Sequence, residues 1–192
     1  MSAALNQLRN FLENQVSISD SDWHYIKDKL AFKEFEKGIC LTEEGIVESS
    51  INFVISGIIR LYYEKEDRDI TINFGFPQSF ISSYSSFLTQ EPSKFMLQAL
   101  TPCAVLVIPK ADLEDIYKHT SCGQQLGRLF SEQFFLYLSE RETSFMINSP
   151  TERYLDLFEE HPRLIQEIPL KFLASYIGIT PQALSRIRAK IS

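Results

Sequence analysis

The segment IPLKFLASYIGITPQALSRIRAKIS, residues 168–192, contains two amphipathic stretches separated by a glycine. Leu173 and Ile177 lie four residues apart, so they share one face of a first short helix. Gly178 follows where the chain must turn, a position at which a positive φ is often needed. Thr180 is a good N-cap for a second helix. Two helices joined by a short turn that contains glycine have the form of a helix-turn-helix, so this segment predicts a DNA-binding motif.

The second of these helices has two chemically different faces. At about 100° per residue, its aliphatic side chains share one face that we expect in the core: Leu184, Ile187 and Ile191. The opposite face collects short and polar side chains: Gln182, Ser185, Arg186 and Ala189. In the major groove an amide pairs with adenine and a guanidinium pairs with guanine. Gln182 and Arg186 are therefore the expected base-reading residues, and the small Ser185 lets the helix approach the base edges.

Basic residues surround this face. Arg188, Lys190 and Lys171 are placed for phosphate contacts, which position a protein without reading sequence. The helix N-terminus at Thr180 is also suited to a phosphate. Residues 163–192 hold five bases and one acid, a formal +4, so the remaining residues sum to −10 in a chain of net charge −6. A basic end on an acidic body predicts an anionic partner confined to this region. A solvated basic helix is the alternative interpretation.

A long helical stretch precedes the motif. Residues 121–148 contain no proline, and their apolar residues recur at spacings of three and four: Leu126, Phe130, Phe134, Tyr137, Leu138 and Phe145. A small β-domain could not cover such a helix along its whole length, so we expect a partner helix and a parallel, coiled-coil-like homodimer. The alternative is a helix that packs wholly on its own domain.

A domain boundary is expected directly after this helix. Ser149, Pro150 and Glu152 fit the N-cap, the first position and the third position of a capping box. This pattern places the boundary at residues 148–149. The segment EHPRLIQEIP, residues 160–169, has two prolines and is expected to be a linker.

The region before the long helix has the sequence pattern of a small β-domain. Short apolar runs between turn signals predict strands within residues 31–38, 50–57, 58–66, 69–77, 94–102 and 104–109. Ile70, Ile72 and Phe74 alternate and are expected to face one way. The serine-rich segment 77–93 is expected to hold a short helix. These strands predict an antiparallel sandwich or barrel-like roll, and with the helices an α+β fold class.

Two helices are expected before the first strand. The first has an apolar stripe: Leu5, Leu8, Phe11 and Leu12. The second is short, with an N-cap at Asp20 or Ser21, and is expected to run through Lys29.

Composition and residue spacing exclude several classes of protein. The chain is 44% hydrophobic and 23% charged, and it has no apolar run near the roughly 20 residues of a membrane span. The N-terminus lacks an apolar secretory core, so we expect a cytoplasmic protein without a membrane partner. An iron–sulfur cluster normally needs four thiolates, and this chain has three widely spaced cysteines: Cys40, Cys103 and Cys122.

The histidines do not form a metal-binding pattern. His24, His119 and His161 are isolated from one another, so we expect neither a metal site nor a cofactor. None of them lies in the β-rich region. This distribution argues against an enzyme of cupin type, whose metal ligands stand on strands, and no catalytic activity is predicted.

A β-roll, a long helix and a C-terminal motif reading LASYIGITPQALSRIRAKI, residues 173–191, resemble the Crp/Fnr family of bacterial transcription regulators, and the chain is similar to the short members of Bacteroidetes-like bacteria. The resemblance implies three parts: a jelly-roll-like, double-stranded β-helix sensor domain of cyclic-nucleotide-binding type at 1–120, a dimerisation helix at 121–148, and a helix-turn-helix domain at 149–192. It also implies a homodimer on a palindromic operator in double-stranded DNA, with Gln182 and Arg186 at base-reading positions.

Two positions depart from the family pattern. Pro181 stands where better-known members carry an arginine, which removes one expected DNA contact. The family usually adds a small β-wing after the recognition helix, and the chain ends at Ser192, so a full wing is not expected.

The resemblance also locates an effector pocket. Cyclic-nucleotide binders in the family carry a Gly-Glu-Leu run, whose Glu takes the ribose hydroxyl, and an Arg followed by a small hydroxyl residue, whose Arg takes the cyclic phosphate. Here Ser82, Ser83 and Tyr84 stand at the first place, and Ser93 and Lys94 at the second. A neutral serine cannot replace the bidentate charge of arginine, so cyclic AMP binding is not expected. Lys94 is the residue that could contact another anionic effector, and the serines are otherwise expected to be solvated turn residues.

Two readings of function stay open from the sequence. The first is a dimeric DNA-binding regulator whose roll senses an unidentified small molecule or has lost sensing. The second is a small-ligand-binding module that acts through protein partners and uses its terminal helices as an interaction surface.

Overall fold

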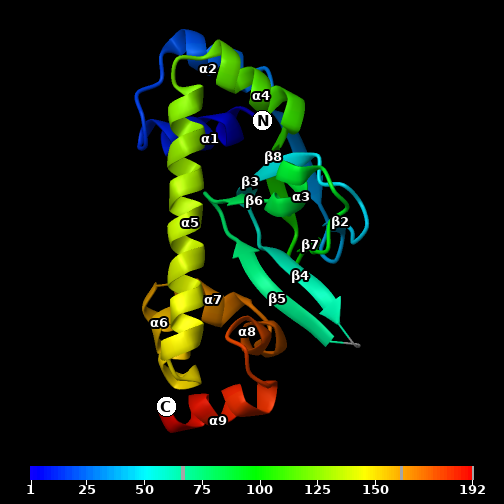
Figure 1. Cartoon of the computed structure of the whole chain (residues 1–192), viewed down its shortest axis with the longest axis vertical. Helices are drawn as coiled ribbons and strands as arrows, with labels where there is room; N and C mark the ends of the chain where they lie inside the picture. The colour runs from blue at the N-terminus through cyan, green and yellow to red at the C-terminus, as the bar shows by residue number, and fades with distance from the viewer. Residues whose placement is uncertain (66–67, 161, 192) are drawn as a thin grey trace. The chain divides into compact units, whose positions relative to one another are not determined.

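Figure 1 shows the computed structural model, which describes residues 1–65, 68–160 and 162–191. The chain forms two compact units. The roll unit comprises Met1–Leu61 and Phe74–Glu132. The C-terminal unit comprises Tyr62–Asn73 and Gln133–Ser192. The chain therefore crosses between the two units three times.

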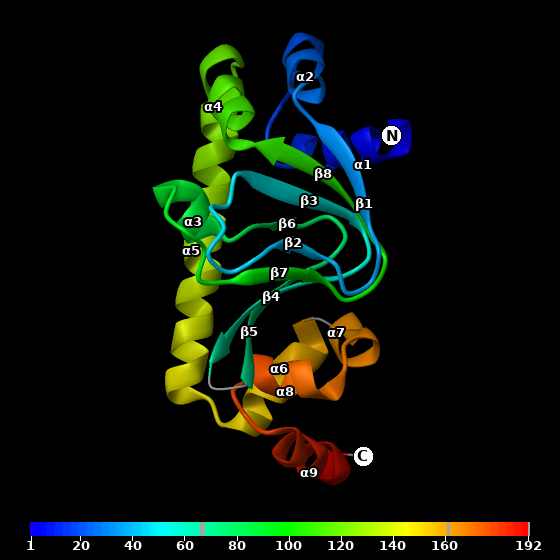
Figure 2. The same ribbon diagram turned by 90° about the vertical axis from the view of Figure 1, so that its right-hand side faces the viewer.

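Two four-stranded sheets build the β-roll (Figure 2). The first has the order β1-β8-β3-β6, with the bounds Ala31–Phe35, Cys103–Pro109, Ser50–Ser56 and Phe80–Ile81. The second has the order β2-β7-β4-β5, with the bounds Cys40–Thr42, Met96–Ala99, Ile59–Lys65 and Arg68–Gly75. The pairs β1–β8, β3–β8, β3–β6 and β2–β7 are antiparallel, which confirms the expected roll. The sequence does not predict β2 or β6, because runs of three and two residues show no periodicity.

The strand β8 is the centre of the first sheet, and its side chains anchor the core. Leu106 lies opposite Phe32 of β1 and opposite Phe53 of β3. Leu106 and Phe53 are fully buried in a cluster that also contains Leu8 and Trp23 from the helices before β1. Strand alternation thus directs one side of the sheet against these helices.

Five helices belong wholly or partly to the roll unit. They are α1, α2, α3, α4 and the first part of α5, at Ser2–Glu13, Asp20–Lys27, Tyr84–Thr89, Lys110–His119 and Gly123–Ile147. The expected stripe of α1 is confirmed, since Leu8 and Leu12 are buried and Leu5 and Phe11 pack partly against the core. The expected cap of α2 is wrong. Ser19 is the N-cap, and its Oγ accepts the Asp22 N–H at 3.1 Å.

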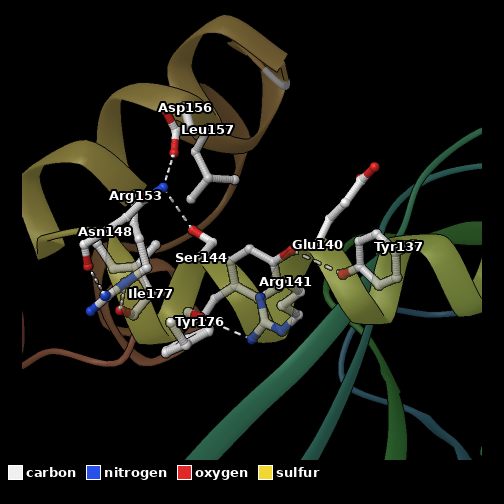
Figure 3. Close-up of a pocket in the computed structure, with 11 residues that line it drawn as sticks. Tyr137, Glu140, Arg141, Ser144, Asn148, Arg153, Asp156, Leu157, Tyr176 and Ile177 are labelled. Carbon is white, nitrogen blue, oxygen red and sulfur yellow. Dashed lines mark hydrogen bonds between the residues drawn. The ribbon is translucent and has the colours of Figure 1, made fainter.

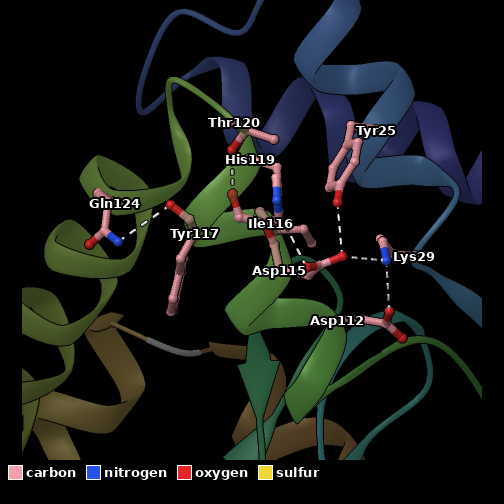
Figure 4. Close-up of polar contacts among 9 residues, drawn as sticks. All are labelled: Tyr25, Lys29, Asp112, Asp115, Ile116, Tyr117, His119, Thr120 and Gln124. Carbon is pink, nitrogen blue, oxygen red and sulfur yellow. Dashed lines mark hydrogen bonds and ion pairs between the residues drawn. The ribbon is translucent and has the colours of Figure 1, made fainter.

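An ion cluster joins the end of α2 to α4 (Figure 4). Lys29 Nζ lies 2.7 Å from Asp115 Oδ2 and 3.3 Å from Asp112 Oδ1, and Tyr25 Oη donates to Asp115 at 2.8 Å. The bond to Asp115 is the main reason why the pKa of Lys29 is raised to about 12. The same bond lowers the pKa of Asp115 below its ordinary value. Both groups are therefore charged at neutral pH.

The long helix α5 runs from Gly123 to Ile147, close to the expected 121–148. At its start, Gly127 lies against Tyr117, and a Cβ at this position would meet the ring at 2.9 Å. The expected apolar stripe becomes more exposed toward the C-terminal end. Leu126 is buried, whereas Leu138 and Phe145 are exposed.

Four helices complete the C-terminal unit: α6, α7, α8 and α9, at Pro150–Glu160, Pro162–Glu167, Leu170–Tyr176 and Pro181–Ile191. The predicted capping box of α6 is confirmed. Ser149 N–H donates to Glu152 Oε2 at 2.7 Å and Glu152 N–H donates to Ser149 Oγ at 3.3 Å. Hydrogen bonds from the Ser149 side chain and backbone to the Glu152 carboxylate lower the pKa of Glu152. The expected linker at 160–169 is wrong, because Pro162 begins the helix α7, a position that proline tolerates. His161 lies outside the described residues.

Within the described ranges, no helix combines the length and the apolar character that a bilayer span requires. The same ranges contain no group of three His, Cys, Asp or Glu side chains arranged to hold a metal ion.

Candidate nucleic-acid interface

The helices α8 and α9 pack through a small buried core. Leu173 and Ala174 of α8 and Leu184 of α9 are fully buried, and Ile177 follows them in the turn at 2% exposure. Tyr154 and Leu157 of α6 are also buried. The prediction that Leu173 and Ile177 point inward is confirmed.

The turn between the two helices follows a regular helix-ending motif. Gly178 has φ +78°, in the left-handed region. Its N–H donates to Ser175 O at 3.1 Å, and Ile179 N–H donates to Ala174 O at 2.9 Å. This pair of bonds is the Schellman motif, which satisfies two of the last carbonyls of a helix. A Cβ at Gly178 would also meet Phe145 Cε1 of α5 at 2.7 Å. Both the φ value and this close contact require glycine here.

The helix α9 begins as its sequence predicts. Thr180 Oγ1 accepts the Ala183 N–H at 3.2 Å, and Pro181 is the first helical residue. The four side chains of the expected outer face are all exposed: Gln182, Ser185, Arg186 and Ala189. Arg186 Nε donates to Gln182 O at 3.4 Å, which directs its side chain along this face. The structure therefore brings Gln182, Ser185 and Arg186 together on one exposed surface.

The inner face of α9 is buried only in its first half. Leu184 is fully buried and Ile187 half-buried, but Ile191 is exposed. The expectation that Ile191 lies in the core is wrong. Seven residues of helix advance about 10 Å, so the last turn extends beyond the position at which Leu184 packs.

The other predicted phosphate contacts are placed separately. Lys190 is exposed near the end of α9. Lys171 is exposed on α8, with its Nζ 4.6 Å from the centroid of the Phe172 ring. Arg188 is half-buried, and its Nε donates to Tyr154 Oη at 3.0 Å. Arg188 therefore joins α9 to α6 within the protein.

Residues 69–73 of β5 belong to the same unit as α8. Ser175 Oγ accepts the Thr71 N–H at 2.9 Å and donates to Asp69 O at 2.9 Å, so one side chain serves two backbone groups of β5. Tyr137 Oη donates to Asn73 Oδ1 at 2.9 Å and lies 3.0 Å from Tyr176 Oη. Burial is the main reason why the pKa of Tyr137 is raised, so its hydroxyl stays protonated and can donate.

A pocket of about 180 Å³ lies among α5, α6 and α8 (Figure 3). Polar and aromatic side chains line it, among them Tyr137, Arg141, Asn148, Arg153, Asp156 and Tyr176. Arg141 and Arg153 donate to backbone carbonyls at the end of α8, as the dashed lines show. No pattern in the sequence marks either arginine, because only the packing of three helices brings them to this turn.

The proposed effector residues of the roll are largely buried. Ser83 is fully buried, and its Oγ lies 2.7 Å from Ser93 Oγ, which donates to Phe95 O. Ser82 is buried and donates to Ser50 O at 2.9 Å. The expectation that these serines are solvated turn residues is wrong, because they satisfy one another and the backbone inside the roll.

Tyr84 and Lys94, the other two residues assigned to this pocket, are not buried with the serines. Tyr84 is half-buried and stacks on Phe87, with ring centroids 6.1 Å apart. Lys94 is exposed. The structure therefore groups the serines and leaves the one cation of the set at the surface.

No pattern in the sequence marks the burial of the charged residues Glu48 and Arg60 of the roll. Glu48 is only 4% exposed, and its carboxylate accepts bonds from Thr42 Oγ1 at 2.7 Å and Ser50 N–H at 3.2 Å. Arg60 of β4 is fully buried. Burial of charge is the one signal that could mark them, and it is visible only in the folded chain.

Comparison with known proteins finds one family that matches part of the chain. Residues 32–120 match the family described as the cyclic nucleotide-binding domain. No curated protein matches the chain significantly.

Solved structures of several bacterial regulators share the fold. The c-di-GMP responsive global regulator CLP of Xanthomonas campestris is 15% identical, with 90% of this chain and 91% of that chain covered and a TM-score of 0.67. A putative transcriptional regulator of the crp/fnr family from Eubacterium rectale is 17% identical, with 95% and 87% covered and a TM-score of 0.69. FixK2 from Bradyrhizobium japonicum is 17% identical, with 84% of each chain covered and a TM-score of 0.69. At these identities the likeness is one of fold.

Proposed function

We propose that this chain, which has a cyclic nucleotide-binding domain and the fold of the Crp/Fnr transcription regulators, is a sequence-specific DNA-binding regulator that acts as a homodimer in the bacterial cytoplasm. Its parts would be a roll of sensor type at 1–120, a dimerisation helix at 121–148 and a DNA-binding domain at 149–192. The relatives in fold are transcription regulators, which favours a regulator over an enzyme.

The observation that carries the proposal is the outer face of α9. Gln182, Ser185 and Arg186 are exposed there on a helix whose inner residue Leu184 is fully buried. An amide and a guanidinium on a face of otherwise small side chains can reach base edges in the major groove. Lys171, Lys190 and the N-terminus of α9 at Thr180 supply phosphate contacts.

Dimerisation is supported by apolar side chains on the C-terminal part of α5. Phe135 is 68% exposed, and Leu136 and Leu138 are also exposed. Clusters of exposed apolar residues mark interaction surfaces. Two parallel copies of α5 would cover these residues and place two α9 helices on half-sites about 34 Å apart in a palindromic operator.

The buried serines at the expected effector pocket of the roll favour a regulator that does not respond to cyclic AMP. Ser83 and Ser93 bond to each other where the family carries its charged ligand-binding residues. Binding of cyclic AMP to the full chain, measured by calorimetry, should be absent. Any other small-molecule effector would bind by different contacts. Lys94, which is exposed and follows Ser93 in the chain, is a cation that can supply one of them.

Selection of bound sequences from a random pool of DNA duplexes tests the function directly. We expect one palindromic sequence to be enriched. Arg186→Ala should weaken binding to it by about 1–3 kcal/mol and relax preference at one base pair. Lys190→Ala should weaken all duplexes alike and lower the salt slope by about 1.

Lys118→Ala is the control, since this exposed base lies on α4 of the roll unit and should not affect DNA binding. Failure of any duplex to bind, or binding that does not depend on salt, would contradict the proposal and favour a module that acts through protein partners.

A further inference from the structure

Two arginines complete the hydrogen bonding at the end of α8. The Schellman motif uses the carbonyls of Ala174 and Ser175, and the carbonyls of Tyr176 and Ile177 follow it at the end of the helix. Arg141 Nη2 donates to Tyr176 O at 3.0 Å, and Arg153 Nε donates to Ile177 O at 3.0 Å. Cations are favourable at a helix C-terminus, so both contacts also suit the helix dipole.

The two guanidinium groups are held in place by one aromatic ring. The Cζ atoms of Arg141 and Arg153 lie 4.9 Å and 4.7 Å from the centroid of Phe145. Arg141 also lies 4.0 Å from the centroid of Tyr176. Stacking fixes a planar guanidinium in the orientation in which it donates. The edge of the same Phe145 ring contacts the turn at Gly178.

Arg153 joins three elements through one side chain. Its Nη1 donates to Asn148 O at 2.6 Å, at the junction of α5 and α6, while its Nε donates to Ile177 O at the end of α8. Arg141 makes a single bond to the turn from α5. The two contacts together tie the end of α8 to both preceding helices.

We infer that Arg141 and Arg153 are positioning residues for the DNA-reading helix, an inference that rests on the proposed function. Only residues 177–180, which form this turn, lie between α8 and α9. With so short a connection, the direction of α9 follows the direction of the turn. At the other end, Arg188 ties α9 to Tyr154 of α6. The arginines thus set how Gln182 and Arg186 are presented, without contacting DNA themselves.

The test compares each arginine with methionine, which keeps an unbranched apolar stem and removes the guanidinium donors. Arg141→Met and Arg153→Met should each lower affinity for the selected duplex about tenfold, the size expected for a lost charge-assisted bond. Affinity for an unrelated duplex should stay within about twofold, and the salt slope should not change, because no phosphate contact is lost.

Arg128→Met is the matched control, because Arg128 is an exposed arginine of the same helix that pairs with Glu132. It should leave both affinities unchanged. Equal losses on both duplexes with a salt slope lowered by about 1 would make the arginines phosphate contacts and overturn the inference. Unchanged affinity for the selected duplex in both variants would also overturn it.

Lysine variants separate a positioning role from general stability. Lysine can replace the single bond of Arg141, but it cannot reach Ile177 O and Asn148 O with two fixed donors as Arg153 does. Arg141→Lys should therefore recover most of the lost affinity, and Arg153→Lys should recover little. Equal recovery at the two positions would contradict the geometry. These variants also keep the test decisive if a methionine variant fails to fold.

Amide hydrogen exchange tests the contacts without DNA. The Gly178 and Ile179 N–H groups should exchange about tenfold faster in Arg141→Met and Arg153→Met, and Arg128→Met should not change them. Unchanged exchange in both methionine variants would overturn the inference even if DNA binding is found. If no duplex is selected at all, the proposed function fails, while exchange still decides whether the arginines hold the turn.

Discussion

At the scale of single residues, Gly178 is the position at which substitution should be most informative. Gly178→Ala places a Cβ at φ +78° and 2.7 Å from Phe145. A left-handed φ alone costs a non-glycine residue about 1–2 kcal/mol. We expect the free energy of unfolding to fall by more than this in urea denaturation.

Gly38→Ala is the matched control for this substitution. Gly38 has φ +91°, and a Cβ there would meet nothing within 4 Å. It therefore isolates the cost of the φ value, and the excess loss in Gly178→Ala reports the contact with Phe145. Equal losses would show that Phe145 moves aside without cost.

The carboxylate of Asp115 should make the stability of the folded chain depend on pH in the acidic range. Its pKa is lowered in the folded chain, mainly by the bond from Lys29, so its stabilising effect is complete above the unfolded pKa of about 3.9 and is lost as pH falls through the lower folded value. Asp115→Asn should lower the melting temperature at pH 7, and its difference from the wild type should shrink toward pH 3.

Lys29, the cation of this pair, loses its charge only at high pH. The pKa of Lys29 is raised to about 12, so its contribution is complete below the unfolded value of about 10.4 and is lost only above it. The wild-type advantage should therefore be constant between about pH 8 and pH 9. Glu132→Gln, which breaks an exposed pair with Arg128, is the control and should have little effect at any pH. A difference for Asp115→Asn that does not vary with pH would contradict the assignment.

At the scale of elements, Ser175 joins α8 to the strand β5. Ser175→Ala removes the acceptor of the Thr71 N–H and the donor to Asp69 O. Thr71 is 1% exposed, so its amide would lose its partner away from water, at a cost of about 1–3 kcal/mol. The Thr71 amide should exchange faster, with Ser185→Ala on the exposed face of α9 as the control. Unchanged exchange at Thr71 would show that the serine does not hold β5.

Elements with a strong local pattern are predictable from the sequence, and those defined by packing are not. The faces of α9 follow from helical periodicity, and the capping box at Ser149 follows from three residues. In β5 the alternation selects Ile70 and Ile72, which are half-buried, whereas Thr71 on the other face is buried by its contact with Ser175. A periodic pattern describes one element and does not include the partner that covers it.

The same limit applies to the candidate site. Gln182, Ser185 and Arg186 share an exposed face as predicted, because they belong to one helix. Arg141 and Arg153 come from two different helices and meet at a turn of a third, so no spacing in the sequence relates them. The burial of Ser83 and Ser93 likewise depends on the fold of the roll.

At the scale of the whole molecule, α5 is the proposed interface between two copies of the chain. Phe135→Lys should convert a homodimer into a monomer, because two charges would be buried opposite each other. Light scattering across micromolar protein concentrations measures the change. Leu88→Lys is the control, since Leu88 is 55% exposed on α3 of the roll unit. A wild-type chain that is monomeric at these concentrations would contradict the proposed dimer.

The three crossings of the chain between its compact units limit how the protein can be recombined. A graft that begins at Gln133 would carry the C-terminal part of α5 and the helices α6 to α9 but omit Tyr62–Asn73, and with it Asn73 and the backbone groups that Ser175 binds. Exchanging the DNA-binding part between two such proteins at a single crossover point would therefore expose the surface of α8 that binds β5. A functional chimera should need the hairpin and the terminal helices from the same parent.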